Sequence, residues 1–136
     1  MYSRVRTYIL AMVAAAMAMV LASVGGAAIQ SALFPWPPGT DISVPATTVA
    51  AVAAMPLIAK LLLIVEWAVG DLLVFAVAIW ANGFRKSILW LAWLVPLIGV
   101  GSNFSEYPYP DWMIVAGVAA VPLAGVAACF VIPGRR

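Results

Sequence analysis

Residues 60–75 read K-L-L-L-I-V-E-W-A-V-G-D-L-L-V-F, an apolar run that carries one cation and two carboxylates. The charged residues are Lys60, Glu66 and Asp71. An ionised side chain in the hydrocarbon core of a membrane is costly unless it reaches water, protein or a partner charge. Whether this run lies in a bilayer or in water therefore decides both the fold and the role of its charges.

The composition of the whole chain indicates a membrane protein. Of its 136 residues, 66% are hydrophobic and only 9% are charged, and the mean hydropathy is +1.11. A soluble domain carries about 25% charged residues, which water solvates at its surface. Lipid must therefore solvate most of this chain, and we expect one all-α integral membrane domain over residues 1–136. The expected partner is the lipid bilayer, and the few dispersed cations indicate no nucleic acid.

The side chains that usually build catalytic or metal sites are sparse. The chain has no histidine, and Cys129 is its only cysteine. Clusters of cysteine and histidine that hold structural zinc or iron–sulfur centres are thus excluded, as is haem held by two histidines. Cys129 lies in the apolar run A-A-C-F-V-I, where a small hydrophobic residue is expected. We predict no catalytic site, no metal and no cofactor.

Three apolar runs predict transmembrane helices. The first, at about 8–33, is longer than the apolar core of a signal peptide, which has roughly 7 to 15 residues. It ends at the proline-rich stretch F-P-W-P-P-G-T-D, which forbids a continuing helix. The other two runs, at about 87–103 and 112–132, are joined by the short loop N-F-S-E-Y-P-Y-P-D-W.

The middle of the chain, residues 44–84, allows two divisions. As one straight helix, these forty or so residues would span on the order of 60 Å, twice the thickness of a hydrocarbon core. A hairpin turning near Glu66–Asp71 gives five spans. A break at Pro56 gives four spans, with a crossing helix at 57–84 and an interfacial or re-entrant helix at 44–55.

The positions of the cations favour four spans, because loops on the cytoplasmic side are enriched in lysine and arginine. With four spans and the N-terminus inside, six cations face the cytoplasm and three acidic residues face out, whereas five spans would split the cations between the two sides. We predict a multi-pass protein of the plasma (inner) membrane with both termini cytoplasmic. The six cations are Arg4, Arg6, Arg85, Lys86, Arg135 and Arg136, and the acidic residues are Asp41, Glu106 and Asp111.

In the four-span arrangement, residues 60–75 supply a candidate intramembrane polar site. Lys60 lies near the outer interface, Glu66 about one turn deeper, and Asp71 near the bilayer centre. Lys60 and Asp71 share a helix face but lie roughly 16 Å apart along the axis, so they do not pair directly. Three interpretations stay open: the carboxylates bond across an interface with another subunit, they bind a proton or cation during transport, or they lie in the solvated turn of a five-span chain.

The first and last apolar runs carry small residues at four-residue spacing. Such ladders let helix backbones approach closely, so that dispersion forces stabilise helix pairs in lipid. We therefore expect close helix contacts at two sets of positions: Ala14, Ala18, Ala22 and Gly26, and Ala116, Ala120, Ala124 and Ala128.

Two functions agree with these features. The first is an accessory or structural subunit of a larger membrane assembly, since short loops, small-residue faces and sparse chemistry suit a packing role. The alternative is a homo-oligomeric small transporter or channel, in which Asp71 and Glu66 bind protons or cations. Other membrane subunits, identical or different, are the expected protein partners in either case.

Overall fold

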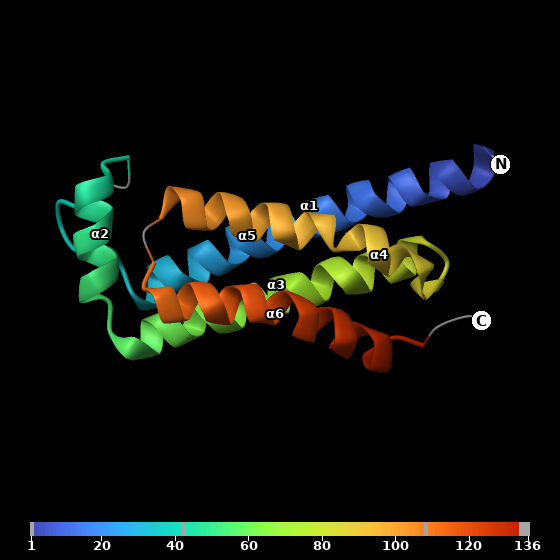
Figure 1. Cartoon of the computed structure of the whole chain (residues 1–136). Coiled ribbons are helices and arrows are strands. Elements are labelled where there is room, and N and C mark those ends of the chain that lie inside the picture. The colour runs from blue at the N-terminus through green and yellow to red at the C-terminus, as the bar shows by residue number, and fades with distance from the viewer. Residues whose placement is uncertain (1, 42, 108, 134–136) are drawn as a thin grey trace.

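The described part of the chain, residues 2–41, 43–107 and 109–133 of a computed structural model, is helical with short connecting loops (Figure 1). Four helical segments in it are long and apolar enough to cross a membrane, and this agrees with the expected all-α class. The elements in chain order are α1 (Tyr2–Leu33), α2 (Pro45–Ala54), α3 (Leu57–Ala81), the 3-10 turn η1 (Lys86–Ile88), α4 (Leu89–Ala92), α5 (Leu94–Glu106) and α6 (Asp111–Val131).

A proline divides the long apolar segment in the middle of the chain. Pro56 lies between α2 and α3. It has no N–H to donate, and the residue before a proline avoids the helical conformation, so Met55 is extended and α2 ends there. Glu66 and Asp71 lie inside the continuous helix α3, not in the turn that the five-span division requires.

A proline also interrupts the third apolar segment. Pro96 cannot donate to the carbonyl of Ala92, and the helix breaks at Trp93 between α4 and α5. The residues Lys86–Glu106 nevertheless form one elongated segment made of η1, α4 and α5 (Figure 1). Pro122 lies inside α6, a helix that bends along its length (Figure 1).

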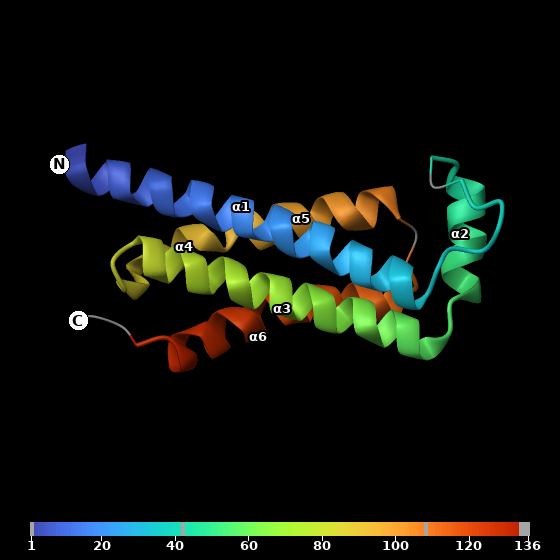
Figure 2. The same ribbon diagram turned by 180° about the vertical axis from the view of Figure 1, so that it is seen from behind.

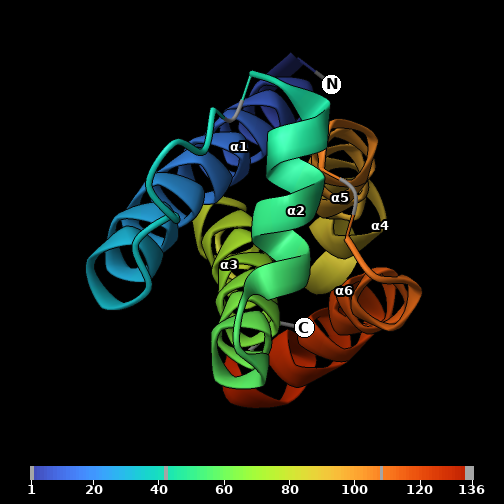
Figure 3. The same cartoon turned by 90° about the vertical axis from the view of Figure 1, so that its left-hand side faces the viewer.

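Helix α3 is the central element of the bundle, with α1 packed along one side and α6 along another (Figure 2). Helices α1 and α5 run in one direction, and α3 and α6 run in the other (Figure 1). Helix α2 lies across one end of the bundle, roughly perpendicular to the long helices (Figure 3). We call this end the α2 end. The opposite end, with the start of α1 and the turn at residues 82–85, carries Arg4, Arg6, Arg85 and Lys86, and we call it the basic end.

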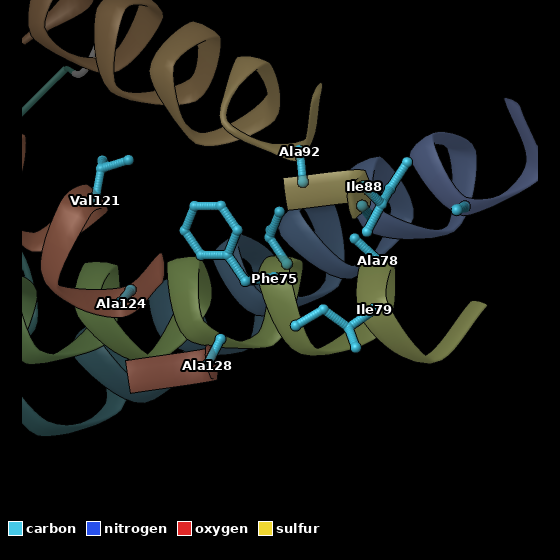
Figure 4. Close-up of a cluster of buried hydrophobic side chains, with 11 residues drawn as sticks. Phe75, Ala78, Ile79, Ile88, Ala92, Val121, Ala124 and Ala128 are labelled. Atoms are coloured by element: carbon cyan, nitrogen blue, oxygen red, sulfur yellow. The ribbon is translucent and has the colours of Figure 1, made fainter. Parts of the chain in front are cut away.

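The apolar core fills the half of the bundle that is nearer the basic end. Figure 4 shows Phe75 of α3 pointing toward the space between Val121 of α6 and Ala92 of α4. These side chains are fully buried, and alanines of α1, α3 and α6 surround them. Small residues allow four helices to meet here at close range. The buried cluster comprises Ala11, Ala15, Val74, Phe75, Ala78, Ile79, Ile88, Ala92, Val121, Ala124 and Ala128.

Candidate functional site

Asp71 is enclosed by its own chain. Its residue surface is only 1% exposed, and neither carboxyl oxygen has a hydrogen-bond partner among the described residues. The side chain of Asp71 therefore points into its own protomer, and the bond across an interface with another subunit stays a prediction. An ionised carboxylate without a partner is unfavourable in such surroundings, since burial removes its hydration and nothing replaces it.

The neighbours of Asp71 on α3 identify the face on which it lies. Trp67 and Phe75, one turn before and after it, lie against two glycines of α6. A Cβ atom added at Gly117 would be 3.0 Å from Cε3 of Trp67, and one added at Gly125 would be 3.4 Å from Cζ of Phe75. Residues four apart share a helix face, so Asp71 faces α6 between these two contacts.

Aromatic rings lie on both sides of this carboxyl group along the bundle axis. Toward the α2 end, Trp67 makes edge-to-face contacts with Phe104 and Tyr109, with ring centroids 5.5 Å and 5.2 Å apart. Toward the basic end, Phe75 contacts Trp93 at 5.6 Å. In the two contacts of Trp67, the edge of one ring faces the π-cloud of the other, which stabilises the pair. Along the bundle axis, the carboxyl group therefore lies at a level between two aromatic layers.

The aromatic layer toward the α2 end includes a phenol group, that of Tyr109. The pKa of Tyr109 is raised to about 12, mainly by burial and to a lesser extent by the neighbouring Tyr107 and the charge of Glu66, while a hydrogen bond with Asn103 opposes the rise. Tyr109 precedes α6 in the loop after α5. Its phenol thus stays a neutral hydrogen-bonding group at neutral pH, at the edge of the aromatic layer.

Glu66 lies on a different face of α3 from Asp71. Its half-buried side chain rests on Gly26 of α1, where an added Cβ would overlap the carboxyl group. The two carboxylates are five residues apart, which corresponds to roughly 7.5 Å along the axis and about 140° around it. They are therefore two separate groups, one between α3 and α1 and one facing α6.

Lys60 belongs to the end of the bundle, away from Asp71. Its Nζ atom donates a hydrogen bond of 3.1 Å to the carbonyl oxygen of Ala53, in the last turn of α2. The last carbonyls of a helix have no partner within it, and cations stabilise that end. Lys60 thus fixes α2 to the start of α3, and the three charges that the sequence singled out do not form one site.

A second buried polar side chain lies in α1. Gln30 is 7% exposed, and both polar atoms of its side chain lack a partner in the described chain. It lies one turn beyond Gly26, on the α1 face that contacts α3 near Glu66. Gln30 and Glu66 thus both lie where α1 packs against the half of α3 toward the α2 end.

The small-residue ladders contribute unequally to helix contacts. In α6, Ala120, Ala124 and Ala128 are buried and Ala116 is half-buried. In α1, Gly26 is buried but Ala14, Ala18 and Ala22 are half-buried, and the fully buried alanines of this helix are Ala11 and Ala15. The sequence offered several equivalent alanine ladders in α1, and only packing against α3 distinguishes them.

Sequence reasoning identified Asp71 but not its surroundings. The aromatic layers formed by Trp67, Phe104, Tyr109, Phe75 and Trp93 depend on contacts between distant segments. The spacing of Trp67 and Phe75, one turn either side of Asp71, was the available signal. Comparison of the chain with protein-family models, with curated proteins and with solved structures finds no match in any of the three.

Proposed function

We propose that this chain is a small multi-spanning membrane transport protein in which Asp71 takes up and releases a proton. The observation that carries the proposal is the burial of an unpartnered carboxyl group within the bundle. An apolar residue would pack there at lower cost, since a polar group buried without a hydrogen bond costs roughly 1–3 kcal/mol in mutational data. Ionisable residues within membrane helices commonly mark proton or ion pathways.

A proton suits the site better than a metal cation. Cations with oxygen ligands need several of them, six or more for calcium or magnesium. The groups nearest to Asp71 on its own face are Trp67 and Phe75, and Val121 of α6 lies midway between Gly117 and Gly125. No cluster of three metal-ligating side chains occurs in the described residues. A proton needs only the carboxyl group itself.

We infer that protons reach Asp71 from the α2 end. Glu66 is half-exposed and lies nearer that end, and Tyr109 and Asn103 supply hydrogen-bonding groups at the aromatic layer. The opposite half is filled by the apolar cluster around Phe75. We therefore assign to Glu66 the exchange of protons with water. Movement of the aromatic layer then gives the carboxyl group of Asp71 access to these protons.

Placement in the membrane follows from charge. The basic end carries Arg4, Arg6, Arg85 and Lys86, whereas Asp41, Glu106 and Asp111 lie in or beside the loops of the α2 end. By the positive-inside rule, the basic end faces the cytoplasm of a plasma (inner) membrane, and α2 lies at the outer interface.

Proton uptake by proteoliposomes tests the proposal. Purified protein is incorporated into vesicles that contain a pH-sensitive dye, and a potassium gradient with valinomycin makes the lumen negative. We expect the lumen to acidify with the natural chain and the rate to fall to that of empty vesicles with Asp71→Asn. Glu66→Gln slows uptake without abolishing it.

The matched control is Asp111→Asn, which removes a carboxylate from the exposed first turn of α6. Its uptake equals that of the natural chain. The absence of uptake by the natural chain, or equal uptake by Asp71→Asn, would refute the transport function.

A role as an accessory subunit is the second candidate, and the exposure of α1 favours it. This helix contacts mainly α3, and its large side chains at nine positions between Ile9 and Leu33 point outward. Such a face suits either lipid or a partner helix. Co-purification in mild detergent distinguishes lipid from a partner helix on this face. The subunit role is supported if a different polypeptide co-purifies at constant stoichiometry and no longer does so with Val20→Trp on the outer face. The chain alone in all preparations contradicts it.

A further inference from the structure

A polar cavity opens at the basic end, away from Asp71 and the apolar core. Its volume is about 590 Å³, and it lies between the first two turns of α1 and the end of α3 with its following turn. The side chains that line it are mostly hydrogen-bonding or cationic. They include Ser3, Arg4, Thr7, Tyr8, Asn82 and Arg85.

The cavity is electropositive. Arg4 and Arg85 both line it, and none of the described residues that line it is acidic. Lys86, which follows Arg85, is engaged elsewhere, because its Nζ atom donates a hydrogen bond to the carbonyl oxygen of Cys129 near the end of α6. Two guanidinium groups from segments far apart in the sequence are thus brought to one concave surface without an acidic residue in its lining. Guanidinium groups bind carboxylate and phosphate oxygens through paired N–H donors.

The turn that carries Arg85 is held in a defined shape. Gly83 and Phe84 both adopt left-handed backbone angles, with φ of 65° and 63°, and the Phe84 N–H donates to the Ile79 carbonyl at 2.8 Å. Glycine adopts this conformation freely, whereas phenylalanine does so only when its surroundings enforce it. The Asn82 side chain donates to the Arg85 carbonyl at 3.1 Å, which fixes the backbone of this cation.

The other wall is joined to the same region. The hydroxyl groups of Tyr8 and Ser87 lie 3.3 Å apart, within hydrogen-bond distance, and connect α1 to the start of η1. The two walls of the cavity are therefore connected, and a ligand would not have to bring them together. Preorganised sites lose less entropy when they bind a ligand.

Aromatic residues place this cavity at a membrane surface. Trp80, at the end of α3, is 66% exposed, and Trp90, at the start of α4, is 70% exposed. Exposed tryptophans at the ends of membrane helices settle at the level of lipid headgroups. The cavity lies at this same end of the bundle, where lipid phosphates are found.

We propose that the cavity at the basic end binds a phosphate-bearing anion through Arg4 and Arg85. The same chemistry fits the headgroup of an anionic phospholipid and free inorganic phosphate. A cationic pocket between membrane helices at the cytoplasmic side is a recurrent binding mode for anionic headgroups. The site is independent of Asp71 and of proton uptake.

Native mass spectrometry tests the lipid source. The protein is released from mixed micelles of phosphatidylcholine and phosphatidylglycerol, and the lipids that it retains are counted. We expect preferential retention of phosphatidylglycerol, with the preference falling roughly five-fold for each arginine removed in Arg4→Gln and Arg85→Gln. Arg6→Gln removes a cation that does not line the cavity and leaves the preference unchanged. Thermal unfolding of each variant, compared with Arg4→Lys and Arg85→Lys, separates lost binding from lost folding.

Phosphorus NMR tests the other source. Inorganic phosphate is titrated into protein held in pure phosphatidylcholine nanodiscs, and its line broadening is compared between the natural chain and the Arg4→Gln, Arg85→Gln double variant. Retention of phosphatidylglycerol without phosphate broadening assigns a lipid site, and broadening that needs both arginines assigns a phosphate site. Equal retention of the two lipids together with no broadening would overturn the proposal, as would an effect of Arg6→Gln as large as that of the double variant.

Discussion

At the scale of single residues, Asp71 conflicts with its surroundings. It is fully enclosed in a bundle whose main apolar cluster is built from alanine, valine, isoleucine and phenylalanine. Packing does not account for this residue, since its carboxyl oxygens have no described partner. Replacing Asp71 is therefore predicted to raise stability and to lower function. Such a trade-off is common where a functional site needs a destabilising group.

The first prediction therefore concerns stability. Asp71→Leu removes an unpartnered polar group and adds apolar surface, so we expect the thermal midpoint in detergent to stay the same or rise. At the neighbouring buried position, Val74→Asn adds a group of the same kind and lowers the free energy of unfolding by about 1–3 kcal/mol. A fall in the midpoint with Asp71→Leu as large as that with Val74→Asn would show that the carboxyl group has a stabilising partner.

Two glycines supply a second prediction at the same scale. A Cβ atom at Gly117 would lie 2.7 Å from Cζ of Phe104 and 3.0 Å from Cε3 of Trp67, rings that also contact each other. Because both rings must shift, Gly117→Ala costs about 1–3 kcal/mol.

Gly101 is the matched control, because it lies in α5 and has no atom within 4 Å of an added Cβ. Gly101→Ala stabilises the helix by roughly 0.5–1 kcal/mol. Thermal unfolding followed by tryptophan fluorescence measures both variants. Equal midpoints for the two would contradict the close approach of α6 to the aromatic layer.

At the scale of helices, cations on α3 and η1 hold the ends of other helices. Lys60 donates to α2 through Ala53, and Lys86 donates to α6 through Cys129. Each cation meets a carbonyl in the last two or three residues of a helix, where carbonyls lack partners and the helix dipole is negative. These links position α2 across the bundle and fix the end of α6.

The third prediction tests the α6 link. Lys86→Met removes the donor while keeping an apolar stem, and we expect a loss of about 1 kcal/mol in the free energy of unfolding. Arg6→Met removes a cation from the same end of the bundle and leaves the midpoint unchanged. Hydrogen exchange of the last turn of α6 gives a second readout, and unchanged protection there in Lys86→Met would speak against the link.

The helices also show what the sequence determines and what it leaves open. The helical class and the break at Pro56 follow from composition and proline chemistry, which act locally. The face of α1 that contacts α3 could not be predicted from the sequence. This helix is apolar all round and has alanines at many four-residue spacings. The orientation of Asp71 toward α6 depends on glycines at 117 and 125, more than forty residues away, and no local pattern contains that contact.

At the scale of the whole molecule, charge is separated between two ends. Four of the described cations, Arg4, Arg6, Arg85 and Lys86, lie at the basic end. The acidic residues Asp41, Glu106 and Asp111 lie near the α2 end. Outside the long helices, the pKa of Asp41 lies below its usual range because the hydroxyl and the N–H of Ser43 donate to its carboxylate. Asp41 therefore stays charged to lower pH than an ordinary aspartate.

The fourth prediction is a labelling pattern. In a Cys129→Ala background, single cysteines at Ala46 and Ser105 react with a membrane-impermeant maleimide on intact cells, because both lie at the α2 end. A cysteine at Ser3 reacts only after permeabilisation. A five-span chain would place positions 46 and 105 on opposite sides, so labelling of only one of them in intact cells excludes the four-span arrangement.

The most direct test of a protonated carboxyl group in the membrane core is its reaction with carbodiimides. Dicyclohexylcarbodiimide partitions into lipid and modifies protonated carboxyl groups there, whereas a water-soluble carbodiimide reaches only exposed ones. Digestion and mass spectrometry locate the adducts. We predict that the lipid-soluble reagent modifies Asp71 and that the water-soluble reagent modifies Asp111 and leaves Asp71 intact. Modification of Asp71 by the water-soluble reagent, or its resistance to the lipid-soluble one, would contradict the account.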